Sequence, residues 1–208
     1  MRKKRPLKRT ENQVRDASLV VIASEDRYAV RQYFEFFRST RIQFLVLETN
    51  DGLSSPQHVL DRLTGYINDY QIGDGDQLWL VLDTDHWIDA GHIANLTEVI
   101  RECKQKDIRV AISNPCFDLW LLLHFTDFPS ESHLSCAEVG QRIRDTVGSY
   151  NKTKIYNLPI TNEAVSLAIE RAKTNFDASH AIPTQLQTGV FKVLADIVNR
   201  RLVTISMS

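Results

Sequence analysis

The stretch Leu78-Trp79-Leu80-Val81-Leu82-Asp83-Thr84-Asp85 decides how the rest of this sequence is interpreted. Its run of consecutive apolar residues predicts a strand that is buried on both faces, as in a parallel sheet. Two carboxylates follow where that strand leaves the sheet. Because side chains at i and i+2 of an extended segment point to the same side, Asp83 and Asp85 can converge on one point. Open α/β proteins build their sites at this carboxyl edge.

Two interpretations of the Asp-x-Asp pair follow from the residues. Carboxylates held close together are unfavourable unless they are protonated or neutralised by a cation. Hard oxygen ligands suit Mg²⁺ or Mn²⁺, so the pair is a candidate metal site. The alternative is that Asp83 and Asp85 are solvated turn residues, because aspartate is common in turns.

A second strand also ends in acids. The run Leu19-Val20-Val21-Ile22-Ala23 is followed by Ser24-Glu25-Asp26, and residues 28–38 have the pattern of an amphipathic helix. Glu25 therefore lies on a strand-to-helix turn, and in a parallel sheet both turns face the same way. A Glu at one strand end and an Asp-x-Asp at a later one are similar to the acid set of the Toprim fold, which carries metal-dependent phosphodiester chemistry.

Alternating strand and helix patterns predict an α/β fold, with right-handed βαβ units in an open parallel sheet of about four strands. The expected strands cover 18–24, 42–47, 78–82 and 108–112, with helices at 27–39, 56–70 and 90–104. From Asn114 onward the pattern is helical: Pro115 at a first helical position, an apolar segment at 117–125, and helices at 136–147, 163–176 and 184–199. We expect a basic, flexible arm (1–16), a Toprim-like core (17–126) and a mainly helical extension packed on it (127–208).

Composition is ordinary for a soluble globular protein: 208 residues, 43% hydrophobic and 25% charged, with a net charge of −1. The charge is uneven, because basic residues gather at the start of the chain. Such an arm is expected to contact the phosphates of nucleic acid, the alternative being a solubilising terminus. The basic residues of the candidate nucleic-acid-binding arm are Arg2, Lys3, Lys4, Arg5, Lys8 and Arg9.

Other sequence features narrow the class of protein. Cys103, Cys116 and Cys136 are odd in number and widely spaced, which argues against a disulfide framework and a zinc site, and favours a reducing, cytoplasmic setting. No segment approaches transmembrane length, so no membrane partner is expected. No glycine-rich phosphate loop is present, so a nucleotide fold of that kind is not supported.

The segment from Ser113 to Phe125 places polar residues at the same sheet edge. Asn114 is expected to cap the helix that follows, and to reach a phosphate or a metal-bound water. Asp118 lies in an otherwise apolar helix, where a buried carboxylate needs a partner. It either supports the site or pairs with a basic residue or backbone amides.

This segment resembles the S-N-P-x-F-E-L-W-L-L-L-H-F motif of RloB-like proteins, with Asp118 in place of Glu. The basic start, Tyr33-Phe34, Tyr150-x-Lys152 and Pro183-Thr184 are also similar to that family. The resemblance implies a Toprim-like fold and a place in prokaryotic anti-phage defence, as abortive-infection proteins. We expect Asp83 and Asp85 to hold Mg²⁺ or Mn²⁺, Glu25 to act as a ligand or general acid/base, and Lys152 to neutralise transition-state charge.

The sequence departs from the family at one place. Where RloB-like proteins read E-G-x-x-T-E, this chain has Glu25-Asp26-Arg27-Tyr28-Ala29-Val30. Either Asp26 substitutes for the missing acid, or activity is altered or lost. The first hypothesis is a nuclease acting on RNA, including tRNA, or on DNA. The second is a non-catalytic nucleic-acid-binding or sensor subunit that works with a partner defence protein, such as an ATPase. A homodimer is a further expectation.

Overall fold

The computed structural model of the chain describes residues 17–37, 39–49, 52–85 and 93–199. A central five-stranded sheet has the strand order β2-β1-β3-β4-β5. The first four strands run parallel, and β5 is antiparallel to β4. The strands are β1 (Ser18–Ser24), β2 (Ile42–Leu47), β3 (Gln77–Asp83), β4 (Arg109–Asn114) and β5 (Gln187–Thr188). The expected α/β fold with an open, mostly parallel sheet is therefore confirmed.

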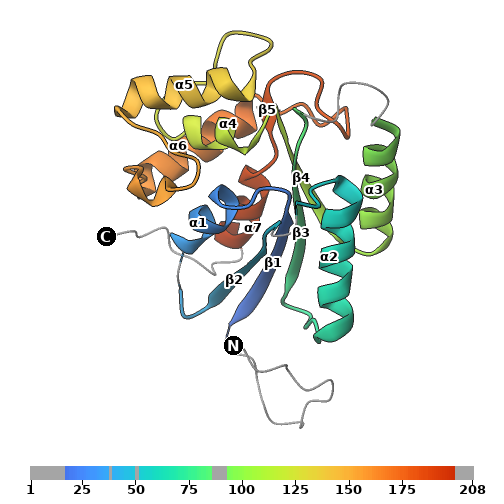
Figure 1. Cartoon of the computed structure of the whole chain (residues 1–208). Coiled ribbons are helices and arrows are strands. Elements are labelled where there is room, and N and C mark those ends of the chain that lie inside the picture. The colour runs from blue at the N-terminus through green and yellow to red at the C-terminus, as the bar shows by residue number, and fades with distance from the viewer. Residues whose placement is uncertain (1–16, 38, 50–51, 86–92, 200–208) are drawn as a thin grey trace.

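Helices cover both faces of the sheet (Figure 1). On one face lie α2 (Pro56–Asp69) and α3 (Ile93–Gln105). On the other lie α1 (Ala29–Glu35), α4 (Phe117–Leu122), α5 (Cys136–Val147), α6 (Asn162–Thr174) and α7 (Phe191–Asn199), with a 3₁₀ turn, η1 (Ile155–Asn157). In these residues no helix is long and apolar enough to cross a membrane.

Alternation along the strands separates two apolar layers. In β1, Leu19 and Val21 pack toward α2 and α3, while Val20 and Ile22 pack toward α1 and the later helices. Each strand residue points to the face opposite its neighbour, so a run that is apolar throughout is buried on both sides. The second layer unites residues of β1 and α1 with residues of α5, α6 and α7.

Local sequence signals explain where several helices begin. Ser55 accepts a hydrogen bond from the His58 amide, and Pro56 occupies the first turn of α2. Ser135 and Glu138 form a reciprocal capping box on α5. That helix ends at Gly148, whose φ of 83° is a left-handed conformation that glycine adopts without steric cost.

Four sequence-based boundaries need correction. The first helix covers Ala29–Glu35 rather than 27–39, and the helix after β4 begins at Phe117, not at Pro115, and ends at Leu122. The expected helix at 184–199 is instead the short strand β5 followed by α7. Two residues cannot show an alternating pattern, so β5 has no periodic signal in the sequence. It is held by pairing with β4, where the Ser113 and Thr188 hydroxyl oxygens lie 2.8 Å apart.

Candidate active site at the carboxyl edge of the sheet

Glu25 and Asp83 lie beside one another at the carboxyl ends of β1 and β3, which pair in parallel. A carboxylate oxygen of Glu25, Oε1, accepts a hydrogen bond from the backbone N–H of Asp83. Asp83 is buried at the last position of β3. Asp85 follows on the exposed turn, where its N–H donates to the Pro115 carbonyl at 3.0 Å. The structure thus brings Glu25 and the Asp-x-Asp pair to one edge of the sheet.

Asp26 uses both carboxylate oxygens for structural contacts. Its Oδ1 accepts hydrogen bonds from the backbone N–H groups of Tyr28 (2.7 Å) and Ala29 (2.5 Å), at the first turn of α1. Its Oδ2 lies 3.1 Å from the ammonium nitrogen of Lys152. The residue that replaces the family's glycine therefore fixes the start of α1 and holds the lysine.

Lys152 stands between two carboxylates. Besides Asp26, its Nζ lies 3.8 Å from Asp118 Oδ1, on α4. Its side chain remains 41% exposed, so solvent and a substrate can reach it. Burial acts to lower the pKa of the ammonium, but Asp118, Asp26 and Asp83 outweigh that effect and raise the pKa above its usual value. Lys152 is a permanent cation within an acidic site.

The loop that carries Lys152 is fastened to α1 by Gln32. The Gln32 side-chain amide donates to the Thr153 carbonyl at 2.8 Å. Its side-chain oxygen accepts from the Ile155 N–H at 2.9 Å. The two polar groups of the Gln32 side chain thus bind the backbone of Thr153 and of Ile155. These two hydrogen bonds fix the loop immediately after Lys152 and so help to position that lysine. Nothing in the sequence indicated a role for Gln32, since a single glutamine in a helix has no distinctive signal.

The pKa of Asp83 is strongly shifted by its surroundings. Burial raises its pKa well above the usual value, and the negative charge of Glu25 raises it further, with smaller effects from Asp26 and Asp85. Lys152 opposes this shift. Burial and like charges together disfavour the ionised form of Asp83. A cation bound at this edge would favour the ionised form of Asp83 again.

Asp118 and Tyr150 place buried polar atoms next to one another, and Asp118 lies beside Lys152. Burial raises the pKa of Asp118, and Lys152 partly offsets that rise. Asp118 Oδ1 and the Tyr150 hydroxyl are buried, and neither makes a well-formed hydrogen bond within the described residues. Burial and the nearby Asp118 charge raise the pKa of Tyr150, which keeps it protonated. In the sequence Tyr150 stands out only as part of a family signature, and its place beside Asp118 is visible only in three dimensions.

The cysteines near the site contradict the sequence-based expectation. Cys116, at the start of α4, and Cys136, at the start of α5, form a disulfide. Their separation of 20 residues in the chain has no framework pattern, because the fold alone brings the two helix starts together. Cys136 Sγ lies 3.1 Å from Asp85 Oδ2, so the bridge borders the acidic edge. Cys103, on the buried face of α3, is the free thiol.

Asn114 does not cap the following helix, so that prediction is wrong. Cys116 occupies the capping position of α4 without a side-chain hydrogen bond. The Asn114 amide instead donates to the Pro183 carbonyl at 3.3 Å, which ties β4 to the segment that leads into β5. The basic residues expected to contact nucleic acid (Arg2, Lys3, Lys4, Arg5, Lys8 and Arg9) lie outside the described residues.

The donor set is suited to a hard divalent cation. Five carboxylates, from Glu25, Asp26, Asp83, Asp85 and Asp118, influence one another around a single ammonium. Among the residues that the structure describes, no three His, Cys, Asp or Glu side chains are already arranged around one ion. Mg²⁺ is commonly bound through one or two carboxylates together with water and substrate phosphate, so Asp83 and Asp85 fit that mode of binding.

Comparison with known proteins gives one match. A family model described as RloB-like protein matches residues 20–197. Searches of curated proteins and of solved structures found no match. The matched region includes every described acid of the site, Lys152 and all five strands apart from the start of β1. The chain therefore belongs to the RloB-like family.

Proposed function

We propose that this protein is a metal-dependent nuclease that hydrolyses phosphodiester bonds in RNA or DNA, acting in prokaryotic anti-phage defence. The carrying observation is the gathering of five carboxylates around one ammonium at the carboxyl edge of a parallel sheet. Mutually repelling carboxylates cost stability and are retained where they have a chemical role. The defence setting is supported by the resemblance to the family's motifs.

Asp83 and Asp85 would hold Mg²⁺ or Mn²⁺. The bound ion would polarise the scissile phosphate and stabilise the leaving oxygen. Glu25 is anchored through one oxygen to the Asp83 N–H, which leaves its carboxylate at the same edge to bind the ion or to move a proton. Lys152 is oriented by Asp26 and Asp118, and its exposed part can neutralise charge that develops on phosphate oxygens.

Asp26 is a positioning residue in this proposal. Both its oxygens are engaged, by the start of α1 and by Lys152, so it does not replace the acid that the family has five residues after Glu25. Asp118 shares this role from α4. In the altered stretch from Glu25 to Val30, one acid of the family is therefore missing, and the added carboxylate of Asp26 forms an ion pair with Lys152.

The first experiment is cleavage of a panel of tRNA, single-stranded DNA and duplex DNA, with Mg²⁺, Mn²⁺ or chelator. The wild type is compared with Asp83→Asn/Asp85→Asn. We expect cleavage by the wild type only and only with metal. Removal of repelling carboxylates leaves the midpoint of thermal unfolding unchanged or raises it.

A matched control removes two carboxylates elsewhere. Asp61 on α2 and Asp145 on α5 each accept a hydrogen bond from an exposed glutamine, at 3.0 and 2.7 Å. Asp61→Asn/Asp145→Asn changes the net charge equally and should retain cleavage. Equal loss in both double variants would contradict the proposed roles of Asp83 and Asp85. Loss of folding in the site variant would show that its acids are structural.

A second candidate function is a non-catalytic or partner-dependent sensor. The observation that favours it is Lys152, which already neutralises part of the acidic cluster without a metal. Metal titration separates the two hypotheses. A nuclease site should show an increase in melting temperature with Mn²⁺ or Mg²⁺ that disappears in Asp83→Asn/Asp85→Asn. Absence of any such increase, with no cleavage, would favour the sensor.

A further inference from the structure

The bridge between Cys116 and Cys136 is not part of a disulfide framework. Small proteins rely on several bridges where their core is too small to hold the fold. This chain has three cysteines in all, and apolar layers cover its sheet on both faces. The core can therefore hold the fold without the bridge, so the bridge can open and close in the folded protein.

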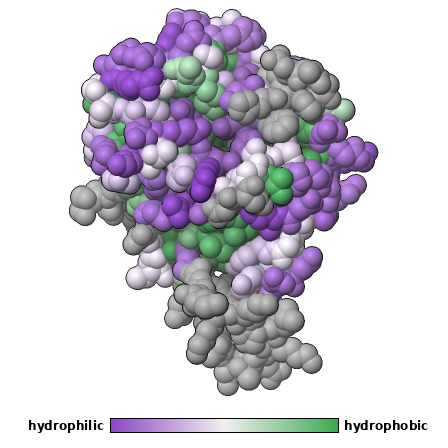
Figure 2. Space-filling model, in the orientation of Figure 1, coloured by the Kyte–Doolittle hydropathy of each residue, from purple (hydrophilic) through white to green (hydrophobic). Residues whose placement is uncertain are grey.

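The two sulfurs differ in their access to solvent. Cys116, directly before α4, is fully buried, whereas Cys136, the first residue of α5, is half-buried. Figure 2 shows mostly hydrophilic surface over the part of the molecule where α5 lies. An accessible cysteine beside a second one is the arrangement of redox-sensing sites, in which the first is oxidised and the second resolves it.

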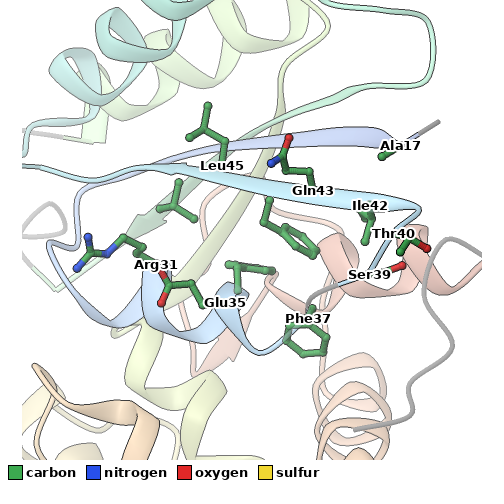
Figure 3. A pocket seen from close by; sticks show the side chains of 12 residues that line it. Ala17, Arg31, Glu35, Phe37, Ser39, Thr40, Ile42, Gln43 and Leu45 are labelled. Carbon is green, nitrogen blue, oxygen red and sulfur yellow. The ribbon is translucent and has the colours of Figure 1, made fainter. Parts of the chain in front are cut away.

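Access to Cys136 does not depend on the hollow at the outer edge of β2. That hollow has a volume of about 620 Å³, and in Figure 3 the side chains of Arg31 and Glu35 reach it from α1, opposite β2. Among the described residues that line it, none belongs to α4 or α5. The half-buried sulfur is instead reached directly from solvent, so a small, water-soluble oxidant or thiol is the reagent that fits.

The bridge borders the Asp-x-Asp turn on two sides. Pro115, directly before one end of the bridge, accepts hydrogen bonds at its carbonyl from the N–H groups of Thr84 and Asp85, each at 3.0 Å. At the other end, Cys136 Sγ lies 3.1 Å from Asp85 Oδ2. A disulfide sulfur has no proton to donate, whereas a thiol in the same place can donate one to the carboxylate. The redox state of the pair therefore changes the hydrogen bonding of Asp85.

We propose that Cys116 and Cys136 are a reversible redox site that regulates the acidic edge. Hydrogen peroxide transfers one oxygen to the Cys136 thiol, which yields a sulfenic acid and one water. The Cys116 thiol then attacks the Cys136 sulfur. The S–S bond forms as the S–OH bond breaks, and the hydroxyl leaves as water with the proton of Cys116. Two molecules of a small thiol reverse this step, giving one hydrogen to each cysteine and leaving as their own disulfide.

The effect of this redox site on Asp85 rests on the metal-binding role proposed above. In the reduced protein the Cys136 thiol donates to Asp85 Oδ2, and a metal ion has to compete with that hydrogen bond. In the oxidised protein no thiol competes for this oxygen. Oxidation should therefore strengthen the binding of Mn²⁺ by roughly two- to five-fold, because a thiol is a weak donor.

The first test counts thiols after the native protein is treated with hydrogen peroxide or with dithiothreitol. The thiols are alkylated under denaturing conditions and counted by mass spectrometry. We expect one alkylated thiol, that of Cys103, after peroxide and three after dithiothreitol. Cys103→Ala is the control and should keep the response of the other two. Three free thiols after peroxide, or a bridge that dithiothreitol does not open in the folded protein, would overturn the proposal.

The second test measures the Mn²⁺ concentration that gives half of the rise in melting temperature, after the reagents are removed under nitrogen. Cys136→Ala forms neither the bridge nor the hydrogen bond, so it should resemble the oxidised wild type in both states. Cys136→Ser keeps a donor and should resemble the reduced wild type. Equal Mn²⁺ midpoints for oxidised and reduced wild type would overturn the regulation. A thiol response without any Mn²⁺ response would contradict the metal site, and the regulation with it, but not the redox chemistry of the pair.

Discussion

The sheet face covered by α2 and α3 is packed with aliphatic side chains, whereas the opposite face also buries aromatic, polar and ionisable groups. Under α2 and α3 the fully buried residues of the described core are Leu, Val, Ile and Ala, with Cys103. On the other face, α1 contributes the buried Tyr33, and α4 contributes Trp120 and Asp118, with His124 just after it. The aliphatic face supports the sheet, and the polar face positions the charged groups of the site.

His124 shows how the polar face satisfies a buried titratable group. Its Nδ1 lies 2.9 Å from the Trp120 carbonyl, which can only accept, so Nδ1 donates there. Its Nε2 lies 3.0 Å from the Tyr33 hydroxyl and accepts from it. Burial lowers the pKa of His124 to about 4, so the ring is neutral at pH 7. His124 is a core residue that links α4 to α1.

The largest expected effect on stability comes from truncating a large buried side chain on each face of the sheet. Trp120→Ala should lower the free energy of unfolding by roughly 3–5 kcal/mol, because it removes a fully buried ring that contacts Tyr33 and His124. Leu60→Ala on α2 should cost roughly 2–5 kcal/mol. Urea unfolding at pH 7 and pH 5 measures both. Only Trp120→Ala should reduce acid sensitivity, since it lets water reach His124; equal behaviour would contradict the comparison.

Acid sensitivity should come largely from the polar face. Folding lowers the pKa of His124 from 6.5 to about 4, so below pH 6.5 the unfolded chain binds a proton that the native chain excludes. This contribution is fully present above pH 6.5 and is lost as pH falls toward 4, amounting to roughly 3 kcal/mol. His124→Gln should be less stable at pH 7 but lose less on acidification. An unchanged pH profile would assign the sensitivity to other groups.

A smaller effect is expected where α1 binds the loop of Lys152. Gln32→Ala removes two hydrogen bonds, to Thr153 and Ile155, and should cost about 1–2 kcal/mol. Gln57→Ala on α2 removes one exposed bond to Asp61 and should cost a few tenths of a kcal/mol. If the nuclease proposal holds, Gln32→Ala should also slow cleavage with unchanged substrate affinity. Equal losses of stability in Gln32→Ala and Gln57→Ala would contradict the idea that α1, unlike α2, holds a distant loop in place.

The smallest expected effects should be alike on both faces. Ser135→Ala removes the cap of α5, and Ser55→Ala removes the cap of α2. Each should lower the free energy of unfolding by about 1 kcal/mol, because a cap satisfies backbone groups locally. Thermal unfolding of both variants measures this. A much larger cost for Ser135→Ala would show that the start of α5, beside the Cys116–Cys136 bridge, is coupled to the site.

Strong periodic signals predicted the parallel part of the fold. Buried strands of apolar residues and the proline and serine at the start of α2 carry their structure in local sequence. The strand β5 and the disulfide could not be predicted this way, because each depends on segments that only the fold brings together.

The candidate site was partly predictable for the same reason. Glu25, Asp83 and Asp85 end buried strands, so topology alone places them at one edge. Lys152 entered through the family resemblance, and its ion pairs with Asp26 and Asp118 are visible only in three dimensions. Nothing in the sequence near Asp26 showed that both its oxygens would be engaged.

The hydrogen bond from the Gln32 side chain to the Thr153 carbonyl joins parts of the chain that are 121 residues apart. All five acids precede the loop at 126–135, and their ammonium follows it. A chain divided within that loop would therefore leave one fragment with the negative charge and the other with its counter-charge. Mixing the two fragments should therefore favour reassembly, more strongly at low salt than at high salt.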